Sequence, residues 1–101
     1  MQDYSIERAG IPNLVFTGEL IGQSAGPNPR IKIYRTSGNK FVAQQDAQLK
    51  LSRAQHFDTA QLLLNWFKDL SGKISPDAED AVEDAANHDD SFKAAWNVHV
   101  D

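Results

Sequence analysis

One segment of the sequence, residues 22–26 (Gly-Gln-Ser-Ala-Gly), has a spacing that could support nucleophilic catalysis. It matches the Gly-x-Ser-x-Gly nucleophile elbow, where a strand turns sharply into a helix and exposes the serine beside an oxyanion hole. Pro27 and Pro29 follow where that helix would begin, and the chain is too short for the large parallel sheet that supports such an elbow. We therefore expect a flexible loop between two strands here, and no catalytic Ser24.

Metal binding is the second chemistry to consider, because the chain has three histidines and many carboxylates. His56, His88 and His99 are far apart, and only residues 87–90 (Asn-His-Asp-Asp) gather several ligand types. A metal needs ligands that converge with fixed geometry, which four consecutive residues at a helix junction rarely provide. Helix capping explains them better, and the sequence has no phosphate-cradling glycine loop or dinucleotide motif. We expect no metal, no cofactor and no enzyme.

Nucleic-acid binding is favoured by four basic residues between positions 30 and 40, which lie near Tyr34 and Phe41. Basic residues interleaved with aromatic ones can contact phosphates and stack on bases. The whole chain is acidic, however, and hairpins commonly carry solvated lysines that protect their edges. We do not expect direct nucleic-acid binding, although this basic hairpin keeps it open as an alternative.

The strongest charge asymmetry lies in residues 75–91, which contain seven acids and neither Lys nor Arg, whereas residues 1–74 contain nine basic and six acidic residues. On a helix, such acids usually form a solvated face opposite an apolar stripe. Carboxylates in a row can also imitate a nucleic-acid backbone and occupy a basic groove on a nucleic-acid-handling protein. The candidate acidic face consists of Glu79, Asp80, Glu83 and Asp84.

The composition indicates one small globular domain over residues 1–101, with 41% hydrophobic and 24% charged residues and a net charge of -4. The absence of cysteine excludes disulfides and thiolate chemistry. The first ten residues lack the apolar segment of a signal peptide, and no apolar run approaches the length needed to cross a bilayer. We expect a cytoplasmic protein that does not bind membranes.

The periodicity of the chain changes near residue 57. Alternating residues predict strands over 13–22, 30–36 and 40–45, and a weaker strand over 47–57 with Leu49, Leu51 and Phe57 on one side. Helical spacing then predicts a helix from a cap at Asp58 to Gly72, with an apolar stripe widened by three further residues. Those three residues are Leu62, Leu64 and Trp66.

A second helix begins at the cap Ser75, with Pro76 in its first position and small residues along its buried face. Asp89 or Asp90 can cap a last short helix. Because strands precede helices, the sequence predicts an α+β fold in which a three- to four-stranded antiparallel sheet is followed by two to three helices. The helices would pack on one face of the sheet and leave the other face free.

A collinear series of residues also carries a resemblance over residues 31–86. It includes Ile31-Lys32-Ile33-Tyr34, Lys40-Phe41-Val42, Phe57-Asp58-Thr59, Trp66-Phe67, Gly72, Glu79, Ala81 and Ala85. With these residues the chain resembles a small phage-encoded anti-CRISPR protein of the type I-F class. In that family the sheet face binds the backbone subunits of an RNA-guided surveillance complex and blocks target DNA. The resemblance places partner contacts at Tyr34 and Asp46.

The first 29 residues lie outside this resemblance, and with residues 34–36 they look equally like small uncharacterised bacterial proteins. Our leading hypothesis is a non-enzymatic protein-binding domain that inhibits a nucleic-acid-handling complex. Its partner would be a protein subunit of that complex, contacted through Tyr34, Arg35 and Asp46 on the free sheet face. The alternatives are a nucleic-acid binder that uses the hairpin, and a small enzyme.

Overall fold

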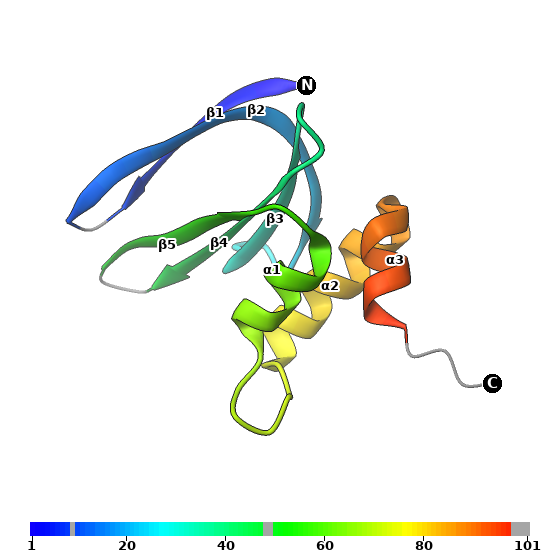
Figure 1. Ribbon diagram of the computed structural model, residues 1–101. Helices are drawn as coiled ribbons and strands as arrows, with labels where there is room; N and C mark the ends of the chain where they lie inside the picture. Colours follow the sequence, from blue (N-terminus) through cyan, green and yellow to red (C-terminus); the bar gives the residue numbers. More distant parts are fainter. Residues whose placement is uncertain (9, 48–49, 98–101) are drawn as a thin grey trace.

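The computed structural model describes residues 1–8, 10–47 and 50–97, and within them a five-stranded sheet precedes three helices. Each strand pairs antiparallel with the next one along the chain, so the sheet order is β1-β2-β3-β4-β5 (Figure 1). The elements are β1 (Gln2–Arg8), β2 (Ile11–Gln23), β3 (Ile31–Thr36), β4 (Phe41–Ala47), β5 (Lys50–Phe57), α1 (Ala60–Phe67), α2 (Pro76–His88) and α3 (Asp90–Trp96).

The α+β class is confirmed, and within the described residues all helices lie between residues 58 and 97, as predicted. The predicted strand count is wrong, because the sheet has five strands and starts at Gln2 rather than at residue 13. In β1, Tyr4 and Ile6 alternate with polar residues, which is the period of a half-buried strand. Of the strand predicted over 47–57, β5 forms from Lys50, while Leu49 lies outside the described residues.

The helices cover one face of the sheet and enclose the larger of two cores. Ile33, Leu63 and Phe92 are completely buried in this helix-covered core. The small residues of α2 allow a very close approach to β2 at Gly22, where an added Cβ would lie 2.5 Å from the backbone oxygen of Ala81. The buried small side chains of α2 are Ala78, Ala81, Val82 and Ala85.

Helix ends follow the capping rules, with one shift from the sequence prediction. Thr59, not Asp58, caps α1, because its hydroxyl accepts a hydrogen bond from the Leu62 amide at 3.2 Å. Ser75 caps α2 as predicted, and Asp89 caps α3 by accepting from the amides of Ser91 and Phe92. No helix within the described parts of the chain is long and apolar enough to cross a membrane.

The second face of the sheet is not free, because the sheet curls until β1 approaches β5 (Figure 1). β1 and β5 do not pair as neighbours, but an Arg8 guanidinium nitrogen (Nη1) donates to the Ala54 carbonyl at 3.3 Å across this opening. The curl encloses a second, concave core. Ile6, Tyr34, Val42 and Ala54 are buried there, and Tyr4, Leu14 and Phe16 pack against them.

Candidate protein-interaction surface

The loop at Ser24 lacks the geometry of a nucleophile elbow, since it connects two strands as the sequence predicts. Ser24 is only 3% exposed, and its hydroxyl accepts hydrogen bonds from the amides of Arg30 and Ile31 at 2.9 and 3.2 Å. The Ser24 amide in turn donates to the Ile31 carbonyl at 2.9 Å. The serine therefore closes the β2–β3 loop from inside and is not presented to a substrate.

Tyr34, the predicted partner anchor, is buried at 5% exposure in the concave core. Its ring centroid lies 4.7 Å from that of Tyr4 and 5.2 Å from that of Phe16. Its hydroxyl donates to Gln44 Oε1 at 3.0 Å. Burial, and secondarily the nearby Tyr4 and the charge of Asp46, raise the pKa of Tyr34 to about 12. The expectation that this tyrosine stands on an uncovered sheet face is therefore wrong.

Arg35 and Tyr34 cannot belong to one contact surface, because successive residues of a strand point to opposite faces. The Arg35 guanidinium lies on the helix side, where it contacts Glu19 at 2.6 Å and Asp89 at 3.2 Å. Asp89 is itself buried and caps α3. Arg35 therefore ties β2 and β3 to the α2–α3 junction. Asp46 is exposed and accepts a hydrogen bond from Gln44 Nε2 at 3.4 Å. Gln44 is the same residue that accepts a hydrogen bond from the Tyr34 hydroxyl.

The residues of the predicted acidic face differ in their surroundings. Glu79, Asp80 and Glu83 are exposed on α2. Asp84 is half-buried, and its carboxylate accepts a hydrogen bond from the Gln23 amide at 3.1 Å, which fixes α2 against β2. Three of the four acids thus form a solvated face, and the fourth has a structural contact.

The structure instead presents a shallow groove between the end of β5 and α1, with a volume of about 460 Å³. Leu62, in the first turn of α1, lines this groove and is 49% exposed, although leucine is usually a core residue. Phe57, which is buried, and Trp66, which is half-buried, form the apolar part of its lining. The groove, called the β5–α1 groove below, is lined by Gln55, His56, Phe57, Asp58, Leu62, Asn65 and Trp66.

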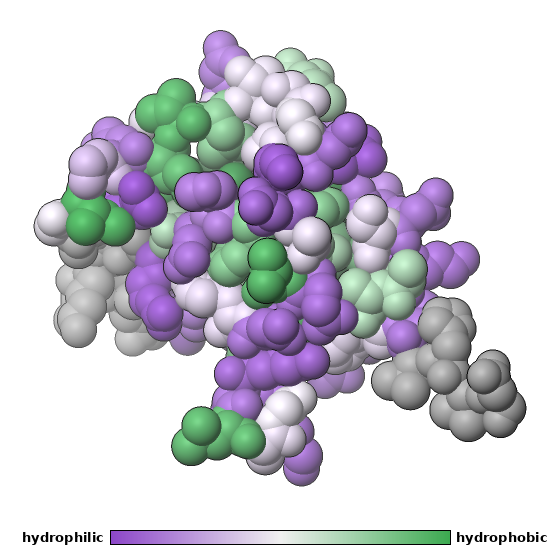
Figure 2. All heavy atoms as spheres, viewed as in Figure 1, coloured by the Kyte–Doolittle hydropathy of each residue, from purple (hydrophilic) through white to green (hydrophobic). Residues whose placement is uncertain are grey.

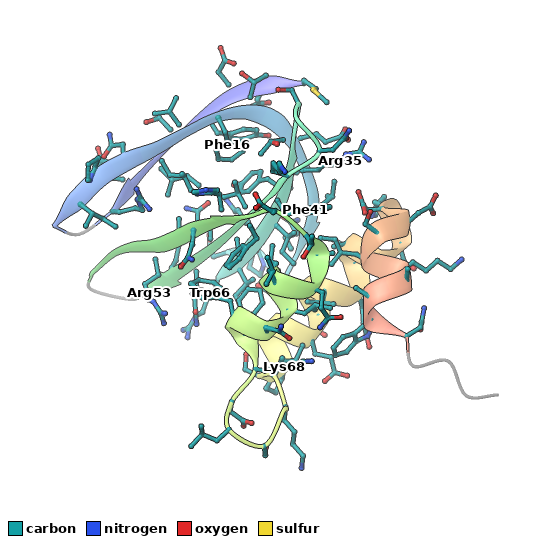
Figure 3. All side chains as sticks on the ribbon, in the orientation of Figure 1. Phe16, Arg35, Phe41, Arg53, Trp66 and Lys68 are labelled. Carbon is teal, nitrogen blue, oxygen red and sulfur yellow. The ribbon has the colours of Figure 1, made fainter. Side chains whose placement is uncertain are left out.

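Trp66 is the central aromatic residue of this surface (Figure 3). Its ring centroid lies 5.7 Å from that of Phe57 and 5.1 Å from that of Phe67. The guanidinium carbon of Arg53 lies 5.1 Å from the Trp66 ring centroid, which is the geometry of a cation–π contact. Among the described residues, Arg53 forms no ion pair. The positive charge of Arg53 is therefore held next to the groove without a carboxylate partner among the described residues, and the Asp58 carboxylate of the groove lining lies 3.6 Å from the Lys40 ammonium.

The backbone of β5 adds a polar edge to the same groove. Ala54 turns its carbonyl away from β4 toward Arg8. His56 lies two residues further along, so its amide and carbonyl point to the same outer side. β5 is the last strand of the sheet, and among the described residues no strand pairs with it on that side, although β1 approaches it near Ala54. An unpaired strand edge of this kind can accept backbone hydrogen bonds from another chain.

The sequence predicted Leu62 and Trp66 as apolar residues of a helix, but it assigned neither residue to a contact surface and gave no role to Arg53. Leu62 and Trp66 appeared as a widening of the apolar stripe of the predicted helix. A stripe too wide for one packing face is the signal that part of it must stay exposed. Comparison with known proteins adds no assignment: no family model, no curated protein and no solved structure matches the chain.

Proposed function

We propose that the chain is a non-enzymatic protein-binding domain whose contact surface is the β5–α1 groove. The observation that carries this proposal is the half-exposed Leu62 beside Trp66, with the Arg53 guanidinium fixed over the indole ring. Tryptophan and arginine are the residue types that most often dominate binding energy at protein interfaces. A groove with both, next to an apolar side chain, has the composition of an interface centre.

The groove is already ordered in the isolated chain, which favours binding. Trp66 is held between Phe57 and Phe67, so its ring loses little conformational freedom when a partner covers it. A hydrogen-bonded ion pair between Arg53 and a partner carboxylate would cost little conformational entropy, because the guanidinium is already positioned over the Trp66 ring. The natural ligand is thus a protein segment that brings an apolar side chain to Leu62 and a carboxylate to Arg53.

This surface replaces the sheet face as the proposed contact. Tyr34 is buried in the concave core, and Arg35 lies on the opposite side of the sheet, where it is engaged with Glu19 and Asp89, so the two residues do not form one contact surface. The narrower hypothesis, that the partner is a subunit of a nucleic-acid-handling complex and that binding inhibits it, rests on the resemblance to anti-CRISPR proteins. If that hypothesis is correct, the inhibitor uses the groove and not the tyrosine.

The test uses the full-length chain as bait, identification of the protein it retains, and titration of that purified protein against variants. We expect Leu62→Gln to weaken binding about tenfold or more, equivalent to ~1.4 kcal/mol. Arg53→Gln should weaken binding less, and its effect should shrink at high salt because the contact with a carboxylate is screened.

The matched control is Val15→Thr, because Val15 is 69% exposed on β2 and replacement by threonine keeps its shape. This variant should bind as the unaltered chain does. Equal affinities for the Leu62→Gln variant and the unaltered chain would refute the groove as the contact surface.

A further inference from the structure

The connection between α1 and α2 projects from the body of the molecule (Figure 1). A turn closes it: the Gly72 amide donates to the Asp69 carbonyl at 3.0 Å, and the Asp69 amide donates to the Lys73 carbonyl at 2.8 Å. Gly72 has a φ of 82°, which other residues adopt only with strain. The segment is therefore a built turn with a defined backbone.

The Asp69 side chain strengthens this turn from inside. Its Oδ1 atom accepts hydrogen bonds from the Ser71 amide at 2.8 Å, the Ser71 hydroxyl at 2.7 Å and the Lys73 amide at 3.1 Å. The hydroxyl of Ser71, followed by the amides of Lys73 and Ser71, lowers the pKa of Asp69 below its ordinary value. The carboxylate charge is thus directed into the turn.

Leu70 occupies the outermost part of this turn and takes no part in holding it together. Its exposure of 110% means that its side chain is more accessible than in the reference extended peptide. The tip of the projection carries hydrophobic surface in a largely polar region (Figure 2). None of the hydrogen bonds that define the turn involves Leu70, so the fold itself does not require an apolar residue there.

The charges around the tip indicate what it would bind. Lys68 and Lys73 flank the turn, both are exposed, and neither forms an ion pair with any residue that the structure describes. The one nearby carboxylate within the turn, Asp69, is already bound to Ser71 and Lys73 amides. The tip therefore presents one apolar side chain between two lysines that form no ion pair among the described residues.

We infer that the 69–73 turn is a second, separate contact element, which inserts Leu70 into an apolar pocket of a protein partner whose rim carries carboxylates. Burial of Leu70 supplies affinity, and the two lysines select the acidic rim. Because the hydrogen bonds of Asp69 fix the backbone beforehand, little conformational entropy is lost on insertion. The inference stands on different residues from the β5–α1 groove.

A lipid surface is the competing target for a leucine flanked by lysines, and the rest of the molecule opposes it. Asp77 and Glu79 lie in the first turn of α2, which begins at Pro76 and follows the projecting connection. A membrane is a broad surface that would meet these acids as well as the two lysines, whereas a pocket rim contacts only the tip. A single apolar side chain also gives too little burial for binding to a neutral membrane. A protein pocket that surrounds Leu70 satisfies both the apolar and the charged groups.

The experiment places a photo-reactive benzoylphenylalanine at position 70 of the full chain, and at position 15 as an exposed control. Cross-linking is carried out in cell extract, and the partner and its cross-linked peptide are identified by mass spectrometry. The inference requires a specific cross-linked product from position 70. An excess of the unlabelled chain must suppress this product, whereas an excess of the Leu70→Ser variant must leave it unchanged. The cross-linked peptide must border a pocket with carboxylates.

The purified partner is then titrated with variants of the full chain. We expect Leu70→Ser to weaken binding by about tenfold to a hundredfold. Lys68→Gln with Lys73→Gln should weaken binding about threefold to tenfold at low salt and have little effect at high salt. Leu70→Ser should leave thermal unfolding unchanged, because the side chain is fully exposed.

Three results would overturn the inference: equal cross-linking from positions 70 and 15, unchanged affinity of Leu70→Ser, or sedimentation of the chain with phosphatidylcholine–phosphatidylglycerol vesicles that Leu70→Ser abolishes. The Leu62→Gln variant tests the groove proposal independently of the turn. Loss of binding in Leu62→Gln with no loss in Leu70→Ser contradicts only the turn, and the reverse contradicts only the groove.

Discussion

The two faces of the sheet are both buried, but by different means. On one face, the helices supply Leu63, Val82 and Phe92 to complete a core with the strand residues. On the other face, Ile6, Tyr34 and their neighbours come only from strands, and the curl of the sheet brings them together. A sheet followed by helices on one side therefore does not imply an open binding face on the other.

Local features of β2 make the curl possible. At Gly18, an added Cβ would collide with the backbone oxygen of Arg35, so this position requires glycine. The pairing register of β2 with β3 shifts between Leu20 and Gly22. Such shifts bend a strand and increase its twist. The concave core thus depends on backbone geometry, whereas the helix-covered core depends on side chains from separate elements.

The largest expected effect is in the helix-covered core. Phe92→Ala removes a completely buried ring that packs edge-on against Phe41 at 5.1 Å, and should destabilise the fold by about 3 to 5 kcal/mol. Chemical denaturation measures the change. Val15→Ala, at an exposed position, should change stability by less than about 0.5 kcal/mol. A loss below about 1 kcal/mol for Phe92→Ala would mean that α3 is not part of the core.

An intermediate effect is expected where the helix layer contacts the sheet backbone. Gly22→Ala places a methyl group 2.5 Å from the Ala81 oxygen and 2.6 Å from the Ala85 nitrogen, so α2 must move away from β2. We expect a loss of about 1 to 3 kcal/mol in thermal or chemical unfolding. Gly38→Ala is the control, because its nearest neighbour would be 3.9 Å away. Equal stability of the two variants would contradict this close approach.

The smallest effect concerns the polar group of the concave core. Tyr34→Phe removes the hydrogen bond to Gln44 but keeps the ring, and should cost about 1 kcal/mol. Because burial raises the pKa of Tyr34 from 10.0 to about 12, its contribution is complete below pH 10 and is lost as pH rises toward 12. Unfolding measured across this range should depend less on pH in Tyr34→Phe. If the free energy of unfolding depends on pH equally in Tyr34→Phe and in the unaltered chain, Tyr34 is not buried.

Features determined by neighbouring residues could be predicted from the sequence, as the caps Ser75 and Asp89 show. Features that join distant residues could not. The curl brings Arg8 to Ala54, and no local pattern encodes this contact. The prediction for Tyr34 was wrong for that reason. The alternation in β3 correctly placed Tyr34 on the sheet face opposite Ile31 and Ile33, but Tyr4 of β1 and Phe16 of β2 cover its ring.

The candidate site shows the same limit. The apolar pattern of α1 predicted that Leu62 and Trp66 belong to a wide stripe, but which part of the stripe the sheet covers depends on how α1 packs beside β5. Only Ala60, Leu63 and Leu64 are buried in that helix. The two proposed contact elements are recognised in the structure as exposed apolar residues with ordered neighbours, Leu62 next to Trp66 and Leu70 on its turn.

The arrangement of the two cores along the chain also bears on folding during synthesis. All residues of the concave core lie before Phe57, and each strand pairs with the one made just before it. That core can therefore close before the last helix, α3, is complete, because synthesis from Phe57 to Trp96 takes about 2 to 8 seconds at ~5–20 residues per second. During this interval Ile31, Ile33 and Phe41 remain uncovered. A ribosome-bound chain ending shortly after β5 should therefore hold a formed curl and recruit chaperones to its bare opposite face.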